Sequence, residues 1–189
     1  MKTNELCLFA IPGPFTAQLF AGSHAVLFTE DTLSYRQGRF DYQLRNAQGR
    51  RGALFPQLAG ADGFSASCSW IWDGTYLQWG GVAFYLLRDY VYPDSASRTV
   101  SHSDAVSFSN VPSITWSPDY LVIGRETRTS LNRALEQLHP RCVCILCGTP
   151  SWKALLWKAD CAKANIPCLW MEETGMLVFK QSPDSRTLL

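Results

Sequence analysis

Hydrophobic and polar positions divide the chain into a strand-rich first part and a second part in which strands alternate with helices. Short apolar runs bounded by turn residues predict strands in the first part at 6–10, 16–20, 24–29, 68–72, 75–79 and 82–87. A turn at 21–23 separates two of them. Asp73 with Gly74, and Gly80 with Gly81, separate the last three, and each pair favours a two-residue type I′ turn. The last three strands are therefore predicted to form an antiparallel meander.

After Pro118 the pattern changes to strand, helix, strand, helix, strand. The apolar runs predict strands at 120–123, 141–147, 166–170 and 176–179. A turn is predicted near 172–175. Antiparallel hairpins followed by β-α-β-α-β indicate a mixed α/β (α+β) fold, with either one mixed sheet or two packed sheets and helices outside.

Two helices are predicted between these strands. The helix at 130–138 carries three leucines on one face, Leu131, Leu135 and Leu138. Thr129 or Ser130 can cap it, and Pro140 ends it. For the second helix Thr149 is the predicted N-cap and Pro150 the first helical residue, and the helix is expected to run to about Ala164.

Between the two groups of predicted strands, the segment 33–63 has weak periodicity and is predicted as a surface strand and loop. It carries the first set of candidate contact residues: Arg36, Arg39, Arg45, Arg50 and Arg51. The stretch 36–51 has a net charge of +4, from five arginines and one aspartate. Such a stretch can meet phosphates, although it is more often a solvated face. The segment 93–112, rich in serine and threonine, is predicted as a loop or long connection.

Composition limits the class of protein. With 189 residues, 47% of them hydrophobic and 17% charged, we expect one domain over 1–189 with a sizeable core and a surface short of charge. Its strand-rich half would span about 1–112 and its β-α-β-α-β half about 118–180. The net charge of +1 gives no general attraction to nucleic acid or anionic membrane. Neither a signal peptide nor a run of apolar residues long enough to cross a bilayer is found, so we expect a soluble chain.

Cysteine spacing gives no firm metal site. The seven cysteines are an odd number with uneven spacing. In a strand, Cys142 and Cys144 would share one face and Cys147 would lie on the other. This favours buried strand cysteines that act as small hydrophobic residues, with metal or redox chemistry as the alternative.

The second set of candidate contact residues lies in the predicted helix after Gly148: Trp152, Lys153, Lys158 and Lys163, together with Trp157. Aromatic rings stack on bases and lysines meet phosphates, so the set suits a single strand of nucleic acid or a partner surface. Helical spacing also allows each tryptophan to be core or to lie under a lysine stem. The tryptophans of the meander, Trp70, Trp72 and Trp79, are expected to fill a sheet core or a partner interface.

The stretch 118–179 resembles the end of the metallo-β-lactamase-like domain of ComEC-type competence proteins, which form the inner-membrane channel for DNA uptake, and above all their Bacteroidetes-type branch. The resemblance rests on the strand 120–123, the leucine-spaced helix, Pro140 to Val143, Ser151-Trp152-Lys153 with Trp157, Ile166-Pro167, and Gly175 to Val178. It implies a degenerate αββα sandwich.

Active hydrolases of that fold bind zinc through an H-x-H-x-D-H cluster. This chain has three dispersed histidines, His24, His102 and His139, and the strand end at Ile123 continues as Gly-Arg-Glu. The resemblance therefore implies that the metal site has been lost, so we expect no catalytic residue, metal or cofactor.

The implied function is that of a non-catalytic domain of a ComEC-like channel protein at the outer, periplasmic face of the inner membrane, assisting the passage or docking of DNA. The expected partners are the transmembrane channel portion and single-stranded DNA. Two alternatives stay open: a metal-dependent phosphodiesterase or nuclease with atypical ligands, and a stand-alone protein-interaction module.

Overall fold

The structure is a computed structural model that describes residues 4–30, 41–52, 56–59, 65–67, 70–87 and 117–181. Within these ranges twelve strands form two sheets, and there are four helices. The first sheet has the order β12-β1-β2-β3-β4. Its strands are β1 (Glu5–Leu8), β2 (Thr16–Ala21), β3 (His24–Thr29), β4 (Gln57–Ala59) and β12 (Leu177–Lys180). Because β12 pairs with β1, the last described strand lies in the same sheet as the first.

The second sheet has the order β11-β10-β9-β8-β7-β6-β5. Its strands are β5 (Ser65–Ser67), β6 (Trp70–Trp72), β7 (Tyr76–Trp79), β8 (Val82–Leu87), β9 (Tyr120–Ile123), β10 (Cys142–Ile145) and β11 (Cys168–Trp170). Neighbours from β5 to β8 are antiparallel, whereas β8, β9, β10 and β11 are parallel. The parallel strands therefore end at one common edge.

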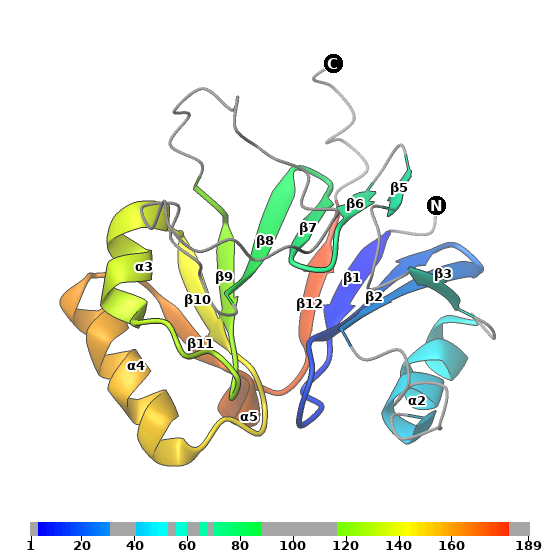
Figure 1. The fold of residues 1–189 in the computed structure, drawn as a ribbon. Helices are drawn as coiled ribbons and strands as arrows, with labels where there is room; N and C mark the ends of the chain where they lie inside the picture. Colours follow the sequence, from blue (N-terminus) through cyan, green and yellow to red (C-terminus); the bar gives the residue numbers. More distant parts are fainter. Residues whose placement is uncertain are drawn as a thin grey trace, which may run out of the picture.

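Helices cover both outer faces of the two packed sheets (Figure 1). Helix α2 (Asp41–Arg51) lies on the first sheet, while α3 (Leu131–Leu138) and α4 (Ser151–Lys163) lie on the second. The short helix α5 (Met171–Thr174) joins β11 to β12. The predicted α+β fold with two packed sheets and helices outside is confirmed.

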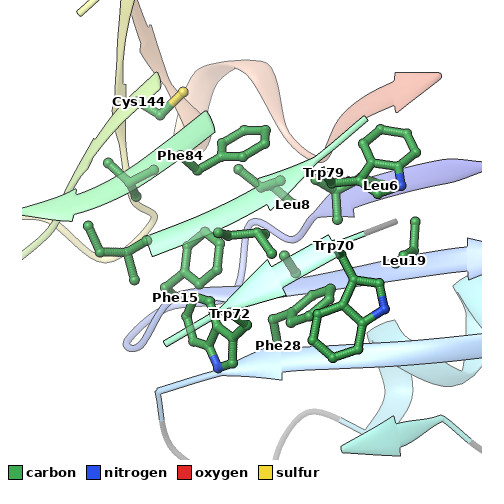
Figure 2. Packing of buried hydrophobic residues seen from close by; sticks show 14 of the residues in the cluster. Leu6, Leu8, Phe15, Leu19, Phe28, Trp70, Trp72, Trp79, Phe84 and Cys144 are labelled. Carbon is green, nitrogen blue, oxygen red and sulfur yellow. The ribbon is translucent and has the colours of Figure 1, made fainter. Parts of the chain in front are cut away.

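The main core fills the space between the sheets. Trp70 and Trp72 from the second sheet pack against Phe28 of the first, with ring centroids 5.1 and 5.8 Å from that of Phe28 (Figure 2). Trp79 belongs to the same cluster and is buried. Burying aromatic side chains contributes most of the energy of such a core. The sequence left open whether these tryptophans lie in a sheet core or in a partner interface, and the structure places them in the core between the sheets.

The hairpin prediction holds at one turn and is shifted at the other. Gly80 and Gly81 have φ of 56° and 81°, as a type I′ turn requires. At the preceding turn, Asp73 N donates to Tyr76 O over 3.2 Å, so the loop residues are Gly74 and Thr75 and not Asp73 and Gly74. Only Gly74 of these two has a positive φ, which excludes type I′. The Asp73 carboxylate stabilises this turn, because it accepts hydrogen bonds from the backbone N–H groups of Thr75 and Tyr76.

The helix α2 corrects the predicted surface strand and loop. Leu44, Ala47 and Gln48 are its buried positions, at helical spacing over the first sheet. Only two of these three positions are apolar, so the sequence shows a weak helical period of hydrophobic residues. The composition of the segment nevertheless favours a helix, because arginine, glutamine, leucine and alanine all have high helix propensity. The predicted loop at 93–112 lies outside the described residues.

Smaller corrections concern the ends of elements. Thr149 does not cap α4, because its hydroxyl donates to Leu146 O over 2.8 Å and Pro150 holds the N-cap position. Ser130 is the N-cap of α3, without a side-chain cap hydrogen bond. The predicted turn at 172–175 is largely helix α5, and the predicted strand 68–72 begins at Trp70 within the described residues.

Candidate functional site

A cleft of about 510 Å³ opens where β3 and the parallel strands β8, β9 and β10 end. Its floor is apolar and is formed by Leu86, Leu87, Val122 and Leu146. Its charged lining residues, within the described ranges, are Glu30, Arg125 and Glu126. The carboxyl ends of parallel strands are the usual place for a binding site in such folds. This cleft is therefore the first candidate site. It includes Gly124, Arg125 and Glu126, the segment after Ile123 that contains no histidine to bind a metal.

Two polar residues of the cleft, Glu30 and Thr127, hold its walls together. The carboxylate of Glu30 accepts from the Phe15 N–H over 2.7 Å. The Thr127 hydroxyl donates to Leu87 O over 2.7 Å and accepts from the Gly124 N–H over 3.0 Å. These bonds fix the loop after β9 to β8 and the loop between β1 and β2 to β3. Among the described residues that line the cleft, the hydroxyl of Thr127 bonds to backbone groups and not to a general base.

The residues of the cleft do not fit a zinc centre. Among the residues that the structure describes, no three or more His, Cys, Asp or Glu side chains come together as metal ligands. His24 lies in β3 and His139 follows α3, while His102 lies outside the described residues. We therefore derive no metal-dependent step from this site.

The second candidate site is the outer surface of α4. Trp152, Leu155 and Leu156 leave 69%, 58% and 54% of their surface exposed. They lie on the side of the helix opposite to Ala154, Trp157 and Cys161, which are buried against the second sheet. Ala159 and Ala162 extend the exposed side. We call these five residues, Trp152, Leu155, Leu156, Ala159 and Ala162, the outer face of α4.

The lysines of α4 have partners within the protein. Lys153 Nζ donates to the carbonyl oxygens of Arg125 and Thr127 over 2.8 and 2.7 Å and lies 4.8 Å from the centroid of Trp157. The pKa of Lys153 is lowered, chiefly because partial burial penalises its charge. Lys158 forms an ion pair with Glu173 at 2.9 Å. Lys163, 75% exposed, lies 3.6 Å from Asp160. Trp157 is thus core beneath a lysine, and Trp152 is exposed.

The arginine set is divided. Arg45 and Arg50 are exposed on α2. Arg51 is held inside the fold, with its Nε 2.9 Å from Glu5 Oε2 and its guanidinium 4.7 Å from the centroid of the Phe20 ring. Arg36 and Arg39 lie outside the described residues. Because α2 and α4 lie on opposite outer faces of the sandwich, the structure does not bring Arg45, Arg50 and Arg51 together with the α4 set (Figure 1).

Leu155 and Leu156 are missing from the candidate residues predicted by sequence. Their exposure could have been predicted from the sequence, because the helical period that buries Ala154 and Trp157 places both leucines on the opposite side of the helix. The sequence also left open whether Cys142 and Cys144 are core. Both are buried, but Cys147 packs on the same core as Cys144 because β10 ends at Ile145 and its alternation stops.

Comparison with known proteins gives one match. The sequence model of a family described as ComEC C-terminal domain matches residues 6–181. No curated protein and no solved structure matches the chain significantly. None of the described helices is long and apolar enough to cross a bilayer. The chain belongs to the family of ComEC C-terminal domains, which implies association with a membrane-bound ComEC competence protein and a role in DNA uptake.

Proposed function

We propose that this ComEC C-terminal domain assists DNA uptake by contact and without hydrolysis, as a single domain at the outer, periplasmic face of the inner membrane. Its partner in this proposal is the transmembrane channel portion of the same protein. The observation that carries the proposal is the outer face of α4, where a tryptophan and two leucines are each more than half exposed.

Among the described residues no element covers the outer face of α4, and an uncovered apolar helix face is unusual on a domain surface. Helices that cover a sheet normally turn charged and polar residues to solvent. Here the outer face of α4 has a tryptophan at one end and a leucine pair one turn away. Tryptophan at the centre of an interface is the residue that most often carries its binding energy. Such a face fits a protein groove that removes all three large side chains from water.

The contacts of the lysines favour docking on protein over binding of DNA by α4. A lysine that meets phosphates must have its ammonium group available, and binding then depends steeply on salt. Lys153 already donates to two carbonyls and Lys158 pairs with Glu173, so only Lys163 of the three extends mainly into solvent. Contact with single-stranded DNA therefore falls in this proposal to α2, on which Arg50 is exposed.

The cleft supports the non-hydrolytic part of the proposal. Its floor is formed by aliphatic side chains, and Glu30 and Thr127 are used to hold its loops. Elemental analysis of protein purified without chelator, beside a nuclease assay with added Zn²⁺ and Mn²⁺, tests this part. Stoichiometric zinc together with cleavage would establish the alternative, a nuclease with atypical ligands.

Binding to the channel portion tests the proposed docking. The purified domain is added to nanodiscs that hold the transmembrane portion of the same protein, to empty nanodiscs and to single-stranded DNA. We expect the unaltered domain to bind only the discs that hold the transmembrane portion. In Leu156→Glu we expect the affinity for these discs to fall by at least about tenfold. Val178→Glu is the matched control, because Val178 is also an exposed apolar residue but lies on β12.

Equal affinity of Leu156→Glu and the unaltered domain for the loaded discs would exclude the outer face of α4 as the docking surface. Equal binding to empty discs would identify lipid as the partner. If the domain binds DNA in a salt-dependent manner and Leu156→Glu weakens this binding, the outer face of α4 is instead a DNA-binding surface.

A further inference from the structure

We propose that the free edge of β12 binds one extended peptide segment of a partner protein, which adds an antiparallel strand to the first sheet. The inference stands apart from the docking of α4, because it rests on the backbone of a strand in the other sheet. In strand addition the backbone groups of an open sheet edge provide the hydrogen bonds, and side chains at alternate positions provide the specificity.

The register shows which backbone groups of β12 are free to bind such a segment. The Gln181 N–H donates to the Asn4 carbonyl oxygen over 3.1 Å, which continues the antiparallel ladder between β12 and β1. In an antiparallel pair the backbone groups of successive residues point alternately toward and away from the partner strand. Phe179 therefore directs its N–H and C=O groups at β1. Val178 and Lys180 direct theirs at the open edge.

No described element pairs with this edge. β12 is the end strand of the first sheet, and its ladder is with β1. Within the described ranges, the backbone groups of Val178 and Lys180 make no hydrogen bond to a turn or loop. Apolar side chains lie in water here, since Val178 is 38% exposed and Met176, just before the strand, is 41% exposed. An edge that is both unpaired and apolar is a template for another strand.

The second sheet limits the occupant to a single strand. The Phe179 ring packs against Phe84 of β8 and Tyr120 of β9, with centroids 5.1 and 5.0 Å away. Farther along the core, Phe28 of β3 packs against β6. The two sheets therefore lie over each other in the same order, and β10 and β11 extend beyond β12 (Figure 1). One added strand would lie over this extension, whereas two whole copies joined at β12 would bring their extended sheets into collision.

Side chains on the two sides of the edge define the chemistry of the segment. On the inner side, Leu169 of β11 packs against the main core but is only partly buried, so the residue opposite Phe179 should be apolar. On the outer side, the Lys180 side chain is 67% exposed, and its Nζ lies 3.6 Å from Glu5 Oε1. An acidic residue opposite Lys180 would complement its charge. The exposed Val178 completes the pattern with a second apolar residue opposite it.

Hydrogen exchange of backbone amides, measured by NMR, tests the proposal with a synthetic peptide. The probe has the core glutamate–leucine–valine between pairs of threonines, which matches Lys180, Phe179 and Val178 in the antiparallel direction. In the free domain we expect slow exchange at Phe179 and fast exchange at Val178 and Lys180. Saturating peptide should slow exchange at these two residues by at least about tenfold and leave Phe179 unchanged. Unchanged exchange at Val178 and Lys180 would overturn the proposal.

Two N-methylated peptides separate backbone pairing from side-chain contact. Methylation of the glutamate and valine nitrogens removes the N–H groups that would face β12, so binding should be lost. Methylation of the leucine nitrogen alters the other edge of the peptide, so binding should be kept. Equal affinity of the two modified peptides would overturn strand addition.

A charge reversal tests the predicted acidic position. Lys180→Glu should weaken binding of the peptide by about threefold or more, and a peptide with lysine in place of the glutamate should restore it. Lys163→Glu is the matched control, because Lys163 is 75% exposed on α4 and should not affect either peptide. If Lys180→Glu binds the original peptide as tightly as the unaltered domain does, the assigned register is wrong.

Val178→Pro tests the edge from the side of the domain. Proline removes an N–H that does not bond to β1, so the fold should be kept while affinity for the peptide falls by at least about tenfold. Val178→Glu keeps the backbone groups of the edge and therefore stays a control for the outer face of α4. Peptide-free dimers of the domain that Val178→Pro dissociates would assign the edge to a second copy and overturn the proposed occupant.

Discussion

The ammonium group of Lys153 lies 4.8 Å from the ring centroid of Trp157 and joins α4 to the loop after β9. One cation thereby covers a buried aromatic ring and ties down two carbonyl groups beside the cleft. The same contact explains how α4 can keep an apolar outer face, since the lysine that follows Trp152 turns toward the cleft loop. From these contacts we expect Lys153 to stabilise the fold.

Replacing Lys153 with methionine should therefore destabilise the domain. The variant loses two hydrogen bonds from a charged donor, and we expect the free energy of unfolding to fall by about 1–3 kcal/mol. Urea denaturation measures this change. Lys163→Met is the control, because its side chain is 75% exposed and a change below about 0.5 kcal/mol is expected. Equal losses in the two variants would contradict the structural role.

Arg51 and Arg50 form a second matched pair. Arg51 joins α2 to β1 through its ion pair with Glu5 and covers the ring of Phe20, whereas Arg50 is exposed. We expect Arg51→Met to lower the free energy of unfolding by about 1–2 kcal/mol and Arg50→Met to change it by less than about 0.5 kcal/mol. If Arg51→Met leaves the denaturation midpoint unchanged, the pair is not stabilising.

Stability at high pH should depend on Cys7. Burial raises the pKa of the Cys7 thiol from about 9 to about 11. The folded chain therefore holds this proton while the unfolded chain loses it, so the stabilisation is complete below about pH 9 and is lost as the pH rises toward 11. Chemical denaturation at several pH values should show a shallower loss over this range in Cys7→Ala. Parallel pH profiles would show that the thiol does not contribute.

Gln18 offers a route to a more stable domain. Its side chain is fully buried, and neither polar atom of its amide has a hydrogen-bond partner in the described part of the chain. Gln18→Met keeps the size and removes the desolvated amide, so an increase of about 1–3 kcal/mol in the free energy of unfolding is expected. Gln78→Met is the control, because the Gln78 amide oxygen accepts from the Tyr76 hydroxyl over 3.1 Å and no gain should follow. A loss of stability in Gln18→Met would mean that the amide is satisfied in solution.

The sequence predicts this fold where the signal is local. The strands at 24–29, 82–87 and 120–123 have the observed bounds, because each is a mainly apolar run between turn residues. Helix α2 could not be recognised in that way, since two apolar contacts with the first sheet hold a mostly polar helix. The family resemblance at 118–179 is confirmed and extends to 6–181.

The candidate site was only partly predictable. Trp152 was named from its residue type, but the burial of Trp157 and the engagement of Lys153 depend on the loop after β9, which lies close by only in the folded chain. The cleft likewise joins segments that are far apart in sequence, such as Glu30 and Glu126. Residue type and spacing alone carry no information on such contacts.

The most direct test of the account is the frequency of transformation in a competent host whose ComEC protein carries variants of this domain. Leu155→Glu with Leu156→Glu removes the outer face of α4, while Glu30→Gln with Glu126→Gln removes the carboxylates of the cleft. A contact role predicts a loss of at least about tenfold for the α4 variant at normal protein levels, and little change for the cleft variant. Normal transformation with the α4 variant, together with loss in the cleft variant, would contradict it and point to chemistry in the cleft.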